Sequence, residues 1–201
     1  RAIDALPAGY DRVLLGYARC GDAVLGLAAR HAPLTCMAAH DCIACLLGSN
    51  ARHAVEHAAE PGTYWQSAGW VERSASDGDG GLGPSALFGG DQPDPADPAW
   101  QRLVAKYGED NAAYLWAELR GSLQRYRRVA YVDTGTGPQD SLAAEAARRA
   151  AGRGLAFARL PGDASWLRAL VDGPWDDSQR FLTVPPGGRV VRAADGSLAA
   201  A

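Results

Sequence analysis

Short apolar runs that alternate with helical patterns constrain the fold of this 201-residue chain more than any other feature. Runs typical of buried strands occupy residues 11–17, 34–38, 128–132, 155–160 and 181–184. Helical patterns follow the first four of these runs, at residues 22–31, 43–47, 139–153 and 164–171. Repeated strand, turn and helix predict an α/β fold, with a mostly parallel sheet and helices on both faces in a doubly wound, Rossmann-like arrangement.

The rest of the chain predicts how the domain is organised. We expect a single α/β domain over residues 1–201, because 47% of the side chains are hydrophobic and can fill one sizeable core. Residues 74–98 are rich in glycine and proline and predict a mobile loop or lid. The tail after residue 191 is predicted to be disordered.

Charge and hydropathy argue against nucleic acid and membranes as partners. The formal net charge is −3 and the arginines are spread along the chain, so there is no basic footprint for nucleic acid or an anionic membrane. No apolar run reaches the roughly 20 residues that a membrane-spanning helix needs. We therefore expect a cytoplasmic protein with a small-molecule substrate, and no nucleic-acid or membrane partner.

A short turn between a strand and a helix concentrates the reactive side chains. His40, Asp41, Cys42 and Cys45 fall within six positions, and the carboxyl ends of parallel strands would bring Cys20 close to them. Imidazole and thiolate are preferred zinc ligands, so we predict a zinc site at Cys20, His40 and Cys42, with Asp41 or Cys45 as a further ligand or supporting group. Cys42 begins a helix, whose dipole would stabilise a thiolate.

Two other interpretations of this region stay open. The cysteines could be a redox or structural pair without metal, and the spacing of Cys42 and Cys45 is that of dithiol oxidoreductases. His53 and His57 belong to an H-x-x-E-H pattern found in zinc peptidases, but a solvated helix face is the favoured explanation.

Candidate ligand-binding residues also lie elsewhere in the chain. Asp133, Thr134 and Gly135 form a glycine-rich turn before a helix, which is suited to holding an anion on backbone N–H groups or is a simple tight turn. An aspartic protease is excluded because only one such triplet is present. Aromatic side chains could wall a pocket for a flat or methylated ligand: Tyr64, Trp65 and Trp70.

Six ordered motifs resemble a known family. They are YARCGDAVLGL, AHDCIACLLGS, PGTYWQSAGW, KYGEDNAAYLW, AYVDTG and FLTVPPG, and together they resemble the uncharacterised domain of unknown function 1638 from about residue 11 to 188. The resemblance implies an α/β domain whose members are often encoded near corrinoid-dependent methyl-transfer systems. It also implies an earlier strand, with an Ala-Cys-Gly turn, that is missing before Arg1. The family's motif positions fall on Cys20, Gly21, His40, Asp41, Cys42, Gly48, Ser49, Gly62, Thr63, Tyr64, Gly69, Trp70, Asp133, Gly135 and Pro185.

The leading hypothesis combines the candidate site with the resemblance. We expect a zinc-binding α/β protein in methyl or one-carbon transfer, acting with a corrinoid or methyltransferase protein. The predicted ligand-binding residues include Gly21 and Asp41 beside the zinc ligands. The alternatives are a non-catalytic small-molecule or metal-binding protein and a partner subunit of a methyltransferase complex.

Overall fold

The computed structural model describes residues 3–20, 22–76, 93–123 and 125–201, and its contacts divide the chain into two compact units. Unit 1 combines Arg1–Val55 with Gly162–Ala201, and unit 2 is Glu56–Pro161. Gly21 and residues 77–92 of the predicted lid lie outside the described residues.

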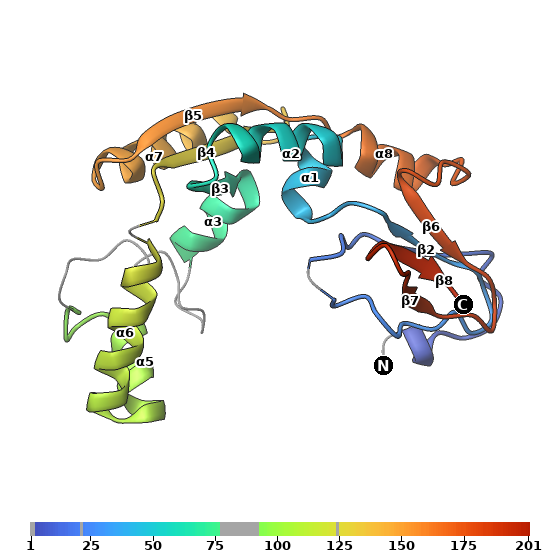
Figure 1. Ribbon diagram of the computed structural model, residues 1–201, viewed down its shortest axis with the longest axis horizontal. Coiled ribbons are helices and arrows are strands. Elements are labelled where there is room, and N and C mark those ends of the chain that lie inside the picture. The colour runs from blue at the N-terminus through green and yellow to red at the C-terminus, as the bar shows by residue number, and fades with distance from the viewer. Residues whose placement is uncertain (1–2, 21, 77–92, 124) are drawn as a thin grey trace. The chain divides into compact units, whose positions relative to one another are not determined.

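Unit 1 contains a three-stranded sheet in the order β1-β2-β6 (Figure 1). Its strands are β1 (Val13–Leu15), β2 (Leu34–Met37) and β6 (Phe181–Val184). β1 and β2 are parallel, as predicted, whereas β6 is antiparallel to β2. The four residues of β2 are buried because the strand is central and its side chains reach both faces of the sheet.

Short helices complete unit 1. They are the 3-10 helix η1 (Ile3–Ala5), α1 (Cys42–Leu46) and α8 (Ser165–Asp172), while α2 (Asn50–Ala59) continues into unit 2. Trp166 of α8 is almost fully buried with Met37 and Phe181, and its indole N–H donates to the carbonyl of Arg180 at 2.8 Å. This packing joins α8 to the central and antiparallel strands.

Two sequence predictions for unit 1 are wrong. Residues 22–31 form turns instead of a helix, because Gly26 adopts a φ of 79° and its N–H donates to the carbonyl of Val190. The tail after residue 191 is ordered: β7 (Val190–Arg192) pairs with β8 (Leu198–Ala200) in an antiparallel hairpin. The turns at 22–31 and the hairpin meet at Val190, which is buried and forms backbone hydrogen bonds with Gly26 and Leu27. The local sequence does not predict these contacts between distant segments.

Unit 2 contains a parallel sheet in the order β3-β4-β5 (Figure 1). Its strands are β3 (Thr63–Ser67), β4 (Arg128–Asp133) and β5 (Ala156–Pro161). Helices α3 (Ala68–Ser76) and α7 (Gln139–Ala151) pack on one face around Tyr131. Cα register aligns Gln66, Tyr131 and Arg159 across the three strands, so their side chains share that face.

A helical hairpin also belongs to unit 2. It consists of α5 (Pro98–Tyr107) and α6 (Glu109–Leu123), joined by Gly108 with a φ of 77°. The rings of Trp100 and Trp116 meet edge to face, with centroids 5.9 Å apart. The ends of the predicted 74–98 loop therefore belong to α3 and α5.

The mixed α/β class and a parallel sheet are confirmed, but the described strands form two three-stranded sheets and a hairpin instead of one sheet. In unit 2, α3 and α7 pack around Tyr131 on the same face of the sheet, and the predicted doubly wound arrangement is not confirmed. No helix among the described residues is both long and apolar enough to cross a membrane.

Candidate metal and thiol site

The parallel strands of unit 1 bring two reactive segments together. The segments that follow β1 and β2 lie side by side, because the N–H of Arg19 donates to the carbonyl of Ala39 at 3.0 Å. The N–H of Cys20 likewise donates to the carbonyl of His40 at 3.2 Å. Cys20 and the AHDC turn are thus neighbours, as the parallel arrangement predicted.

Asp41 is the centre of polar contacts in this turn. One carboxylate oxygen, Oδ1, accepts from the N–H of Ala44 at 2.8 Å and caps α1. The other, Oδ2, lies 2.9 Å from Nδ1 of His40 and 3.7 Å from Nε2 of His53. Burial opposes ionisation most strongly, but the Ala44 N–H and the two histidines together lower the pKa of Asp41.

These three side chains form the candidate metal site. Among the described residues, a group of three donor atoms within 4.8 Å of one another is offered by His40, Asp41 and His53. The two imidazole rings stack with centroids 5.7 Å apart. The side chain of His40 is 60% exposed and that of His53 only 14%, so one edge of the cluster is open to solvent.

His53 is a candidate site residue for which the sequence favours a solvated helix face over a metal ligand. In the structure its side chain is largely buried against Asp41. The first turn of α2 is held there by Asn50, whose side chain accepts from the N–H of His40 at 2.8 Å and donates to the carbonyl of Ala38 at 3.1 Å. The signal for this contact was Asn50 at the start of a helix close after the AHDC turn.

Three thiols lie near the same turn. Cys20 and Cys42 are exposed. Burial, followed by the neighbouring Cys20 and Asp41, raises the pKa of Cys42, which is opposite to the expected effect of the helix dipole. Burial also raises the pKa of Cys45 to about 11, and this thiol contacts Sδ of Met37 at 3.4 Å in the core.

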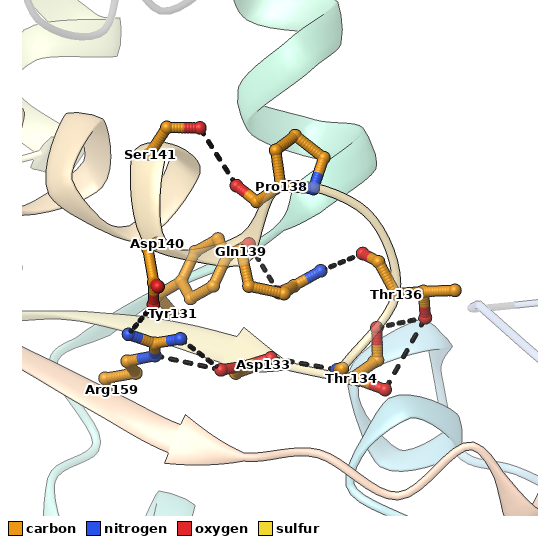
Figure 2. Close-up of polar contacts among 10 residues, drawn as sticks. Tyr131, Asp133, Thr134, Thr136, Pro138, Gln139, Asp140, Ser141 and Arg159 are labelled. Atoms are coloured by element: carbon orange, nitrogen blue, oxygen red, sulfur yellow. Dashed lines mark hydrogen bonds and ion pairs between the residues drawn. The ribbon is translucent and has the colours of Figure 1, made fainter.

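The predicted turn in unit 2 borders a pocket of about 550 Å³. Figure 2 shows how its charged side chains lie, with Arg159 between Asp133 and Asp140. Oδ2 of Asp133 accepts from Nη2 of Arg159 at 2.6 Å, and Oδ1 accepts from the N–H of Gly135 at 2.9 Å. The pocket is lined by Asp133, Gly135, Gly137, Pro138, Gln139, Asp140, Ser141 and Arg159.

Charge balance in this pocket does not favour the predicted anion. The single guanidinium of Arg159 is already paired with two carboxylates, which leaves one net negative charge along the lining. The Gly135 N–H, followed by Arg159, lowers the pKa of Asp133, so that carboxylate stays ionised. Thr134 does not line the pocket, and its hydroxyl instead contacts that of Thr136 at 3.0 Å.

Two of the three predicted aromatic residues, Tyr64 and Trp70, pack together in unit 2. The indole N–H of Trp70 donates to the hydroxyl of Tyr64 at 2.9 Å, and Tyr64 meets the ring of Tyr126 edge to face at 5.2 Å. Burial raises the pKa of Tyr64. Trp70 is 45% exposed and Trp65 is partly buried, and neither lines the 550 Å³ pocket.

Fold and site together define an α/β protein with a candidate metal cluster and an adjacent thiol pair. A family model matches residues 1–171, and the chain belongs to that family, described as protein of unknown function, DUF1638. No curated protein and no solved structure matches the chain.

Proposed function

We propose that this protein binds a zinc ion through His40, Asp41 and His53 and acts in methyl or one-carbon transfer. The observation that carries the proposal is the spacing of the donors. The ligands of a tetrahedral zinc ion with bonds near 2.0 Å are about 3.3 Å apart. The separations from the Asp41 oxygen to the two histidine nitrogens, 2.9 and 3.7 Å, lie on either side of that value.

The chain supports this donor set in two ways. The Ala44 N–H fixes one oxygen of Asp41 and leaves the other for a metal. Asn50 ties the backbone of His40 to the helix that carries His53, so two of the ligands come from segments already fastened together. Three protein ligands leave a fourth position, where zinc would lower the pKa of a bound water to about 7 or hold a thiol substrate as thiolate.

The one-carbon part of the proposal rests on the family resemblance. It implies members encoded near corrinoid-dependent methyl-transfer systems, so the proposed methyl donor is a corrinoid protein. The proposed acceptor is a small thiol, because zinc activates a thiol by binding it as thiolate. Two alternatives use the same site without turnover, namely a metal- or small-molecule-binding protein and a subunit of a methyltransferase complex. In a third, Asp41 only caps α1 and the histidines are its hydrogen-bonding neighbours.

Metal analysis of variants tests the donor set. We would purify the protein anaerobically without added metal and measure bound metals by mass spectrometry in His53→Ala, Cys42→Ser and His57→Ala. We expect about one zinc per chain, lost in His53→Ala and kept in the other two. His57 is the matched control because it lies one turn further along α2 and is exposed.

The opposite pattern has a defined meaning. Zinc lost in Cys42→Ser but kept in His53→Ala would assign the metal to Cys20, His40 and Cys42 instead. Wild-type protein that takes up no zinc, even after incubation with the ion, would refute the metal site and leave Asp41 as a helix cap.

A separate assay tests the chemistry. Zinc-loaded protein is mixed with methylcobalamin and a small thiol, and loss of methylcobalamin absorbance is followed together with the methylated thiol. Turnover that disappears in His53→Ala supports one-carbon transfer. Saturable thiol binding without turnover favours the non-catalytic alternative, and stoichiometric co-purification with a methyltransferase favours the subunit role.

A further inference from the structure

We propose that Cys20 and Cys42 form a reversible disulfide by exchange with low-molecular-weight disulfides. This pair would join the segment after β1 to the first residue of α1, and it is distinct from the CxxC pair of Cys42 and Cys45. The proposal goes beyond the proposed function, because it needs no bound metal and no methyl transfer.

Backbone contacts place the two cysteines together. The N–H of Arg19 donates to the carbonyl of Ala39 at 3.0 Å, and the N–H of Cys20 donates to the carbonyl of His40 at 3.2 Å. These bonds hold the segment after β1 next to the AHDC turn. Cys42 follows His40 by two residues, so the backbone hydrogen bond between Cys20 and His40 brings Cys20 close to the start of α1. The parallel pairing of β1 and β2 therefore sets the approach of the two thiols.

The backbone of Cys20 is unusual. Its φ of 37° is the only positive value among the described residues other than glycine. A side chain rarely occupies this left-handed region unless surrounding contacts hold it there. The hydrogen bond from its own N–H to His40 supplies one such contact and keeps the thiol beside α1.

The other cysteines are poorly placed for this exchange. Cys45 and Cys36 are buried, whereas Cys20 and Cys42 are exposed to solvent and to a small oxidant. The thiol of Cys45 contacts Met37, and that of Cys36 donates to the carbonyl of Leu182 at 3.7 Å. Access to the oxidant therefore favours a disulfide between Cys20 and Cys42 over one between Cys42 and Cys45.

The exchange balances with oxidised glutathione as the oxidant. One cysteine thiolate attacks a sulfur of glutathione disulfide, which breaks its S–S bond, forms a mixed disulfide and releases one glutathione thiolate. The second cysteine thiolate attacks the mixed disulfide, forms the Cys20–Cys42 bond and releases the second glutathione. The two cysteines lose two protons and two electrons, and the two glutathione thiolates take them up.

Peptide mapping tests the pairing directly. The protein is incubated with oxidised glutathione, free thiols are blocked with iodoacetamide, and trypsin digestion is followed by mass spectrometry. Cleavage after Arg19, Arg30 and Arg52 puts Cys20 on peptide 20–30 and the other three cysteines on peptide 31–52. A Cys20–Cys42 bond joins the two peptides, whereas a Cys42–Cys45 bond stays inside one peptide, about 2 Da below its dithiol mass.

Variants complete the assignment. We expect the joined peptides in the wild type and in the double variant Cys36→Ser/Cys45→Ser, their loss in Cys42→Ser, and their return to free peptides with dithiothreitol. An internal bond in peptide 31–52, or two free exposed thiols after prolonged oxidation, would overturn the proposal. The same result in His53→Ala would show that the disulfide stands even if the zinc proposal fails.

Discussion

The replacement of Gln66 by methionine should stabilise unit 2. Gln66 is fully buried in β3, yet among the described residues neither its amide nitrogen nor its amide oxygen has a hydrogen-bond partner. An amide in this position has given up its hydrogen bonds to water without replacement. Methionine has a similar length and volume and carries no group that needs a partner.

The size of the effect follows from the two unpaired groups. A buried polar group without a partner costs about 1–3 kcal/mol, and a shape-conserving apolar replacement costs less than about 1.5 kcal/mol in repacking. We therefore expect Gln66→Met to raise the free energy of unfolding by about 1–2 kcal/mol. For a unit of this size, each 1 kcal/mol corresponds to a rise of roughly 4–8 °C in melting temperature.

A second buried glutamine of the same unit provides the matched control. The side-chain oxygen of Gln139 accepts from the hydroxyl of Tyr131 at 2.7 Å, and its amide N–H donates to the carbonyl of Thr136. Gln139→Met removes both bonds and leaves the Tyr131 hydroxyl without its acceptor, so it should lower the free energy of unfolding by about 1–3 kcal/mol. Urea unfolding followed by tryptophan fluorescence measures both variants.

The two glutamines should therefore give changes of opposite sign. If Gln66→Met destabilised the protein as much as Gln139→Met, the amide of Gln66 would have a partner in solution, such as an ordered water or a bound ligand. That result would refute the reasoning and direct attention to the end of β3 as a binding position.

Three further predictions concern other parts of the chain. Asp133 has a lowered folded pKa, so its stabilisation is complete above its ordinary value of 3.8 and is lost as the pH falls through the folded value. The difference in unfolding free energy between wild type and Asp133→Asn should shrink below pH 3.8 in an acid titration. Burial raises the pKa of Cys36 and Cys45 to about 11, so iodoacetamide at pH 7.5 should label them at least roughly 100-fold more slowly than free cysteine. Gly48→Ala should destabilise unit 1 by about 1–3 kcal/mol in urea unfolding, because its φ is 82° and the new Cβ would lie 2.6 Å from Oδ2 of Asp163.

Sequence predicted best those elements whose own residues carry the signal. The run at 128–132 became β4, where four consecutive residues are fully buried, so continuous hydrophobicity was enough to find it. β3 was missed because its sequence TYWQS mixes aromatic and polar side chains. Two of those polar residues, Thr63 and Gln66, are buried in the strand that pairs with β4, and this pairing is not visible in the local sequence.

Elements that depend on distant partners could not be predicted. The residues at 22–31 have a helical pattern, but hydrogen bonds with the segment around Val190 replace those of a helix. The sequence of β6 likewise does not predict whether the strand runs parallel or antiparallel to β2. A chain that returns from α8 can run either way beside β2, and packing of Phe181 with the α8 cluster accompanies the antiparallel choice.

The candidate site shows the same division between neighbours in sequence and neighbours in space. CxxC spacing pointed to Cys42 and Cys45, but parallel strands bring Cys20 to Cys42, and the start of α2 brings His53 to Asp41. His40 takes part in both groups, because its carbonyl holds the backbone of Cys20 and its ring belongs to the proposed metal site. A disulfide that displaced His40 would change the affinity for zinc, and by linkage bound zinc would change the equilibrium of disulfide formation by the same factor. The geometry around His40 therefore couples zinc binding to disulfide formation thermodynamically, although metal analysis and peptide mapping test the two proposals separately.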